Sequence, residues 1–129
     1  MKSTVVIDTN ILLRYLRNDH PTLSIGAKKI FEKAYKNLVN IYLDEIVLAE
    51  TIWVLSSHFK TPKSIIVSKL LEQLYFDWIV NPRKKLMIKA LGLFGRTNLS
   101  YIDCWIFTVN KSLKTSLETF DNDLKKLNK

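Results

Sequence analysis

Short runs of apolar, mostly β-branched residues alternate along this chain with longer segments in which apolar residues recur at helical spacing. The short runs are typical of buried strands, and the longer segments are typical of amphipathic helices. Strands are expected at residues 4–7, 39–43, 78–80 and 116–120, the third of which also reads as an extended linker. Helices are expected at residues 10–16, 21–34, 45–59, 62–75, 82–94, 100–110 and from 121 to the C-terminus.

Strands that are separated by helices favour parallel pairing through right-handed crossovers. We therefore predict an α/β fold with a single domain over residues 1–129, in which helices flank a central, mostly parallel sheet. In such sheets, functional sites form beyond the carboxyl ends of the strands. Asp8 and Asp121 directly follow predicted strands, and Asp103 stands in the first turn of a predicted helix.

The most informative acid is Glu50, which interrupts a segment, residues 46–55, that is apolar almost all round. A helix of this kind is expected to be buried. A buried carboxylate must be hydrogen-bonded, paired with a cation or bound to a metal, because an isolated buried charge is very costly. An ion pair with an arginine is the simplest alternative to a metal.

Together, the four acids favour one metal site, although each of the three aspartates is also placed to cap a helix. Convergent carboxylates would repel one another without a cation, and a hard divalent ion such as Mg²⁺ or Mn²⁺ removes that conflict. A metal held by carboxylates polarises a phosphoryl oxygen and orients a water, which suits phosphodiester hydrolysis.

The charge balance agrees with a polyanionic partner. The chain has 20 Lys and Arg residues against 12 Asp and Glu residues, for a net charge of +8. Such a surface favours nucleic acid, although well-solvated lysines are an alternative. The candidates for contacts with an RNA backbone are Arg14, Arg17, Arg83, Lys84, Lys85 and Arg96.

Other features narrow the class of protein. The single cysteine, Cys104, excludes an intrachain disulfide and a cysteine cluster for zinc, and it is read as a small core residue. Neither a signal peptide nor a membrane-spanning stretch is recognisable, so a cytoplasmic location is expected. The glycine-rich phosphate-binding loops and the serine nucleophile elbow are absent from the sequence.

Four motifs, in order, resemble those of the PIN domain family of metal-dependent nucleases, and within it the VapC-like toxins of toxin–antitoxin pairs. They are residues 5–10 (VVIDTN), 48–55 (LAETIWVL), 101–104 (YIDC) and 117–121 (LETFD). The resemblance covers essentially the whole chain. The chain departs from the family pattern at Cys104, where alanine is usual, and lacks the usual glycine in residues 110–115.

The resemblance implies a Mg²⁺- or Mn²⁺-dependent endoribonuclease, and it assigns roles to individual residues. Metal-binding roles fall on Asp8, Glu50, Asp103 and Asp121, supporting polar roles on Asn10 and Thr119, and an auxiliary acidic role on Asp123. It also implies a homodimer that a cognate antitoxin protein sequesters, for example by placing an arginine in the carboxylate pocket.

The chain's 14 aromatic residues point to a shared surface, because they exceed what a small core easily hides. We expect Tyr15, Phe31, Tyr35 and Phe59 on that surface, and we expect Trp53 and Trp105 in the core.

Two other classes of protein compete with the nuclease. The first is a catalytically silent PIN-like scaffold that binds RNA or protein. The second is a signalling receiver domain, which would need an acidic pair after the first strand; Asp8 has no acidic neighbour in sequence. Metal-dependent RNA cleavage separates the nuclease from both.

Overall fold

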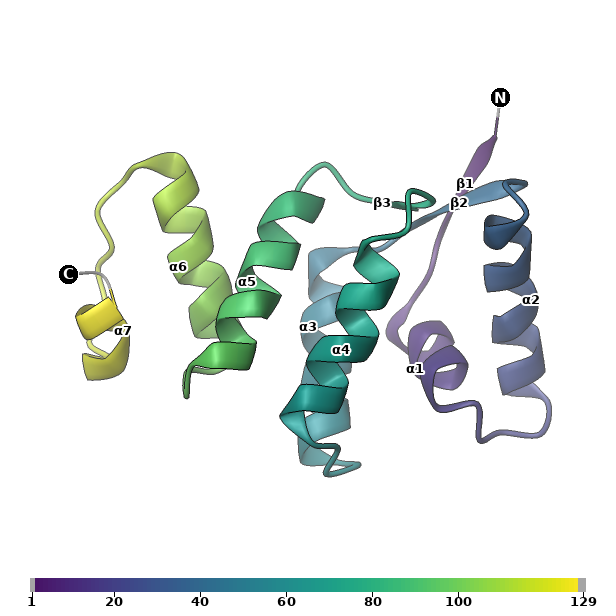
Figure 1. The fold of residues 1–129 in the computed structure, drawn as a ribbon, viewed down its shortest axis with the longest axis horizontal. Coiled ribbons are helices and arrows are strands. Elements are labelled where there is room, and N and C mark those ends of the chain that lie inside the picture. Colours follow the sequence, from purple (N-terminus) through teal and green to yellow (C-terminus); the bar gives the residue numbers. More distant parts are fainter. Residues whose placement is uncertain (1, 128–129) are drawn as a thin grey trace. The chain divides into compact units, whose positions relative to one another are not determined.

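The computed structural model describes residues 2–127, which form three strands and seven helices (Figure 1). The chain divides into two compact units, Met1–Pro82 and Arg83–Lys129, and each is described by itself. Among the described residues, no helix is long and apolar enough to cross a membrane.

The first unit holds the sheet. Its elements are β1 (Ser3–Val6), α1 (Thr9–Arg17), α2 (Leu23–Tyr35), β2 (Val39–Tyr42), α3 (Glu45–Ser57), α4 (Lys63–Leu74) and β3 (Ile79–Val80). All strand pairs are parallel, in the order β1-β2-β3. Val6 is opposite Tyr42, which is opposite Val80, so the three strands end at one edge. The predicted α/β class and parallel sheet are confirmed, including the short third strand.

Local sequence explains where the first-unit helices begin and end. Asp8 has extended backbone and its carboxylate accepts a hydrogen bond from the backbone N–H of Ile11 at 3.0 Å, which caps α1. Asp44 caps α3 in the same way through the N–H of Ile46 at 2.8 Å. Asn18 ends α1 in the left-handed conformation that asparagine tolerates.

The prediction that α3 is buried all round is wrong. One face packs into the unit through Leu48, Ile52 and Leu55, which follow the spacing of a helical stripe. The opposite face is exposed: Ile46 is 77% exposed and Trp53 is 66% exposed. The helix packs against α1 and α4, and these neighbours cover one stripe of it. The prediction of Trp53 as a core residue is therefore also wrong.

The second unit is helical over its described residues. It contains α5 (Lys84–Arg96), α6 (Tyr101–Leu113) and α7 (Asn122–Leu127). Met87, Leu91 and Cys104 are fully buried, which confirms Cys104 as a small core residue. Ser100 caps α6 by accepting a hydrogen bond from the N–H of Asp103 at 3.2 Å.

The predicted fourth strand, residues 116–120, is wrong. The segment has no strand pairing, and Phe120 is 99% exposed. Within residues 2–127 the three strands pair with one another in the order β1-β2-β3, and none of them pairs with this segment. A segment with high β-propensity but no partner strand does not form a strand.

Candidate metal and nucleic-acid site

Two carboxylates meet at the edge where the parallel strands end. Asp8 follows β1 and Asp44 follows β2 at the same register, and both line one open depression of about 550 Å³. Apolar side chains complete its lining: Val6, Ile7, Ile11, Ile46 and Val47. Because α1 and α3 both begin here, the positive ends of two helices face the depression.

Asp44 is not among the predicted site residues, although it directly follows a predicted strand, as Asp8 does. The third strand is followed at this edge by Asn81, whose side-chain N–H donates to the carbonyl of Leu43 at 2.8 Å and to Glu45 at 2.6 Å. This polar link fastens the end of β3 to the start of α3.

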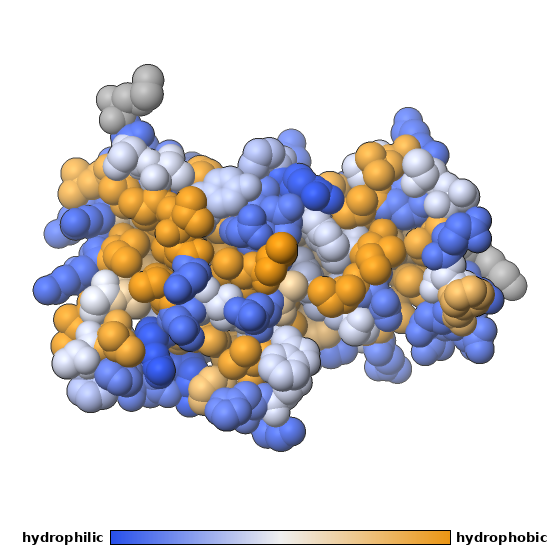
Figure 2. Space-filling view, turned by 180° about the vertical axis from the view of Figure 1, so that it is seen from behind, coloured by the Kyte–Doolittle hydropathy of each residue, from blue (hydrophilic) through white to orange (hydrophobic). Residues whose placement is uncertain are grey.

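Glu50 lies on the exposed face of α3, between Ile46 and Trp53 at helical spacing. Its predicted burial is therefore wrong, and the argument that burial demands a counter-ion no longer applies to it. Figure 2 shows apolar surface over much of the first unit on the side away from the view of Figure 1. A carboxylate set between exposed apolar side chains is typical of a binding surface.

The second unit carries the other predicted acids. Asp103 is half-buried in the first turn of α6. The carboxylate of Asp121 accepts a hydrogen bond from the N–H of Leu124 at 2.9 Å, and the Thr119 hydroxyl accepts one from the N–H of Asp121 at 3.0 Å. Asp123 is exposed beside Asp121 at the start of α7.

Within residues 2–127, no three His, Cys, Asp or Glu side chains are grouped closely enough to hold a metal ion. Of the four predicted ligands, Asp8 and Glu50 belong to the first unit, and Asp103 and Asp121 belong to the second.

The residues present nevertheless fit a hard cation. All four side chains offer carboxylate oxygens, and in the described part of each unit none forms an ion pair with a Lys or Arg of that unit. Asp8 uses one oxygen as a cap, and its second oxygen retains its acceptor capacity.

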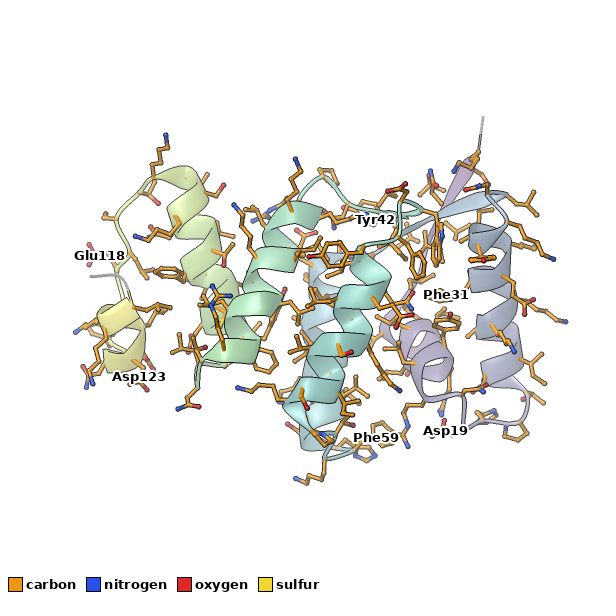
Figure 3. All side chains as sticks on the ribbon, in the orientation of Figure 1. Asp19, Phe31, Tyr42, Phe59, Glu118 and Asp123 are labelled. Atoms are coloured by element: carbon orange, nitrogen blue, oxygen red, sulfur yellow. The ribbon has the colours of Figure 1, made fainter. Side chains whose placement is uncertain are left out.

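The candidate RNA contacts differ in their surroundings. Arg17 donates to Asp19 at 2.8 Å and lies 3.5 Å over the ring of Phe59, and Arg14 is 3.9 Å from Asp19. Asp19 and Phe59 are labelled in Figure 3. The hydrogen bond from Arg17 and its charge hold the pKa of Asp19 below its ordinary value. Arg83 lies over the ring of the half-buried Trp105. Lys85 and Arg96 are exposed on α5, and Lys84 is half-buried.

Comparison with known proteins now places the chain. The family model for the PIN domain matches residues 5–129, and the chain belongs to the PIN domain family. The match spans both compact units, and PIN domains are generally nucleases that use divalent metals. A search of curated proteins and a search of solved structures each found no match.

Proposed function

We propose that this PIN domain is a Mg²⁺- or Mn²⁺-dependent endoribonuclease that hydrolyses RNA phosphodiester bonds. One observation carries the proposal: Asp8, within the family match, stands at the carboxyl edge of the sheet, where α1 and α3 begin. The metal-binding set we propose is Asp8, Glu50, Asp103 and Asp121. Asn10 and Thr119 support it, and Asp123 is auxiliary.

The chain's residues have distinct tasks in this proposal. Asp8 is held by its capping hydrogen bond with the N–H of Ile11 and lines the depression. Glu50 and Asp103 contribute the remaining charge, with Asp121 at the edge of the site. When bound, a divalent ion supplies positive charge that polarises the phosphoryl oxygen and acidifies a water. The basic residues named above position the RNA backbone through its phosphates.

We further propose that the protein is the toxin of a toxin–antitoxin pair, acts in the cytoplasm as a homodimer and is sequestered by its antitoxin. A small aromatic cleft of about 170 Å³ in the first unit supports a docking partner. Tyr15 and Phe31 stack there with ring centroids 3.8 Å apart, and Tyr35 is 73% exposed. Phe31 is buried, so it forms the floor of this cleft and the prediction that it lies on an open surface is wrong.

Tyr15 also lines a second depression, together with Glu72 and Gln73. Burial, followed by the negative charge of Glu72, raises the pKa of the Tyr15 hydroxyl. The partner segment that we propose would place its apolar side chains in the aromatic cleft.

The decisive experiment incubates the purified chain with single-stranded RNA in Mg²⁺, in Mn²⁺ and in EDTA. We expect internal cuts with either metal and none in EDTA, and we expect Asp103→Asn to abolish them. RNA binding without metal-dependent cleavage by pure protein would instead identify a silent scaffold.

The toxin role is tested separately, by expression with and without the neighbouring reading frame. Growth arrest that the neighbour relieves supports it. A monomer that binds no neighbour and arrests no growth contradicts the toxin role while leaving the nuclease proposal intact.

A further inference from the structure

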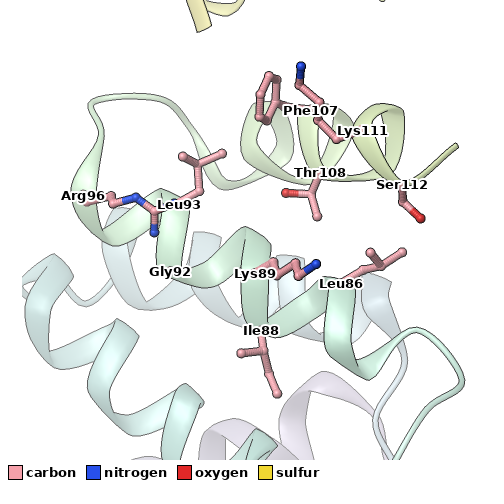
Figure 4. Close-up of a pocket in the computed structure, with 10 residues that line it drawn as sticks. All are labelled: Leu86, Ile88, Lys89, Gly92, Leu93, Arg96, Phe107, Thr108, Lys111 and Ser112. Carbon is pink, nitrogen blue, oxygen red and sulfur yellow. The ribbon is translucent and has the colours of Figure 1, made fainter. Parts of the chain in front are cut away.

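The largest groove of the second unit lies between α5 and α6 and is distinct from the depression that holds Asp8. It has a volume of about 560 Å³ and opens to solvent (Figure 4). Three of its lining residues are cationic, namely Lys89, Arg96 and Lys111, and no acidic residue lines it. This positive charge suits a polyanionic ligand, and the lining has no carboxylate with which to bind a divalent cation.

The positive charge follows the geometry of α5. Lys85, Lys89, Gly92 and Arg96 are spaced four, three and four positions apart, which places them on one face of the helix. Lys111, on α6, lines the same groove (Figure 4). Lys89, Arg96 and Lys111 therefore place positive charge from both helices along the groove.

The groove also offers an aromatic surface. The ring of Phe107 is half-buried in the lining, and the ammonium of Lys111 lies 5.4 Å from its centroid. Leu86 and Leu93 add apolar lining, and Gly92 contributes no side chain, which keeps the middle open. Cations beside an aromatic face are how proteins hold single-stranded nucleic acid, because a base stacks on the ring while its phosphates meet the cations.

We propose that the α5–α6 groove binds a segment of single-stranded RNA, with Lys89, Arg96 and Lys111 on its phosphates and a base against Phe107. This inference rests on the proposed function, which identifies the polyanion as the RNA substrate. It adds Lys89 and Lys111 to the footprint, neither of which the sequence analysis selected. The groove is a binding surface, and cleavage takes place elsewhere on the chain.

The charge is tested by binding of fluorescently labelled single-stranded RNA in EDTA, where metal-dependent cleavage cannot occur. The variant Lys89→Ala/Lys111→Ala is compared with Lys29→Ala/Lys33→Ala, which removes the same charge from exposed positions on α2. Each phosphate contact on a single strand contributes roughly 0.7 to the slope of log affinity against log salt. We expect the slope to fall by about 1.4 in the groove variant and by much less in the control.

The shape is tested without any change in charge. A side chain added at Gly92 meets one atom, the Arg96 guanidinium at 3.5 Å, which is an ordinary contact at the end of a flexible side chain. Gly92→Leu should therefore fold, fill the groove and weaken RNA binding about tenfold or more, while Gly92→Ala should bind nearly as tightly as the wild type. Melting temperatures of both variants verify the fold.

Three results would overturn the proposal that the groove binds RNA: equal salt slopes for the two double variants, unchanged RNA binding in Gly92→Leu, or no binding of RNA by the wild type in EDTA. Equal competition by a poly-glutamate peptide would also contradict it, because a groove for bases and phosphates prefers RNA. Groove-dependent binding without cleavage in Mg²⁺ would refute the nuclease and leave the groove in place. If the groove variants bound and cleaved RNA as the wild type does, the RNA-binding groove would be refuted and the nuclease proposal would remain.

Discussion

Asp8 has two separable tasks, and a pair of substitutions distinguishes them. Its carboxylate caps α1 through the N–H of Ile11 at 3.0 Å, and the proposed function adds a metal-binding task. Asparagine caps helices as well as aspartate does, whereas alanine cannot cap. Asp8→Asn therefore removes the charge and keeps the cap, while Asp8→Ala removes both.

The expected magnitudes differ in kind. Asp8→Ala should lower the free energy of unfolding by about 1 kcal/mol for the lost cap. For Asp8→Asn in EDTA, the lost attraction to the helix end is about 0.3–1 kcal/mol, and relief from the neighbouring charge of Asp44 offsets part of it. We expect this variant to stay within about 1 kcal/mol of the wild type. In Mg²⁺, losing about 3 kcal/mol of transition-state stabilisation corresponds to roughly 100-fold slower cleavage in both variants.

The assay combines urea unfolding in EDTA with single-turnover RNA cleavage in Mg²⁺. Asp77→Asn is the matched control, because Asp77 is an exposed carboxylate of the first unit that lies outside the depression and outside the proposed metal-binding set. It should cleave at close to the wild-type rate. Wild-type cleavage by Asp8→Asn would refute the metal-binding task and reduce Asp8 to a helix cap.

Three further changes test the fold. Gly26→Ala should raise the free energy of unfolding by about 0.5–1 kcal/mol, measured by urea titration, because Gly26 lies within α2 and an added Cβ meets nothing within 4 Å. Arg17→Ala should return the pKa of Asp19 to near its usual 3.8 in an NMR titration. Because folding lowers the pKa of Asp19, the Arg17–Asp19 pair stabilises the fold above the unfolded pKa, and this stabilisation is lost as the pH falls through the folded pKa. Asn81→Ala should cost about 1–2 kcal/mol in thermal unfolding, because two hydrogen bonds at the sheet edge are lost; an unchanged melting temperature would contradict that account.

The sequence predicted the parallel sheet and the helices because both depend on local signals. β-branched runs marked β1 and β2, and apolar residues at helical spacing marked the helices. Residues 116–120 carried the same local signal as a strand and failed, because a strand exists by pairing with another and nothing local specifies that partner.

The second wrong prediction concerned the burial of α3. The composition of α3 indicated a helix covered on all sides, yet coverage depends on how many neighbours reach it, and α1 and α4 reach one stripe. Trp53 and Glu50 on the other face are consequently exposed. For the site itself, the position after a strand placed Asp8 at the carboxyl edge of the sheet, and the same rule applied to every strand selects Asp44 as well.

Capping and metal binding are compatible tasks for one aspartate, so the caps seen here do not count against the site. A carboxylate has two oxygens, and the cap at Asp8 engages Oδ1. The same bond fixes the side-chain rotamer, and a ligand whose rotamer is fixed in advance loses less conformational entropy when it takes up a cation. Asp121 has the same arrangement, with its Oδ1 on the N–H of Leu124. Aspartates that cap helices thus supply carboxylates that are already oriented, and the loss of activity in a variant that preserves the cap is the evidence that would separate function from structure.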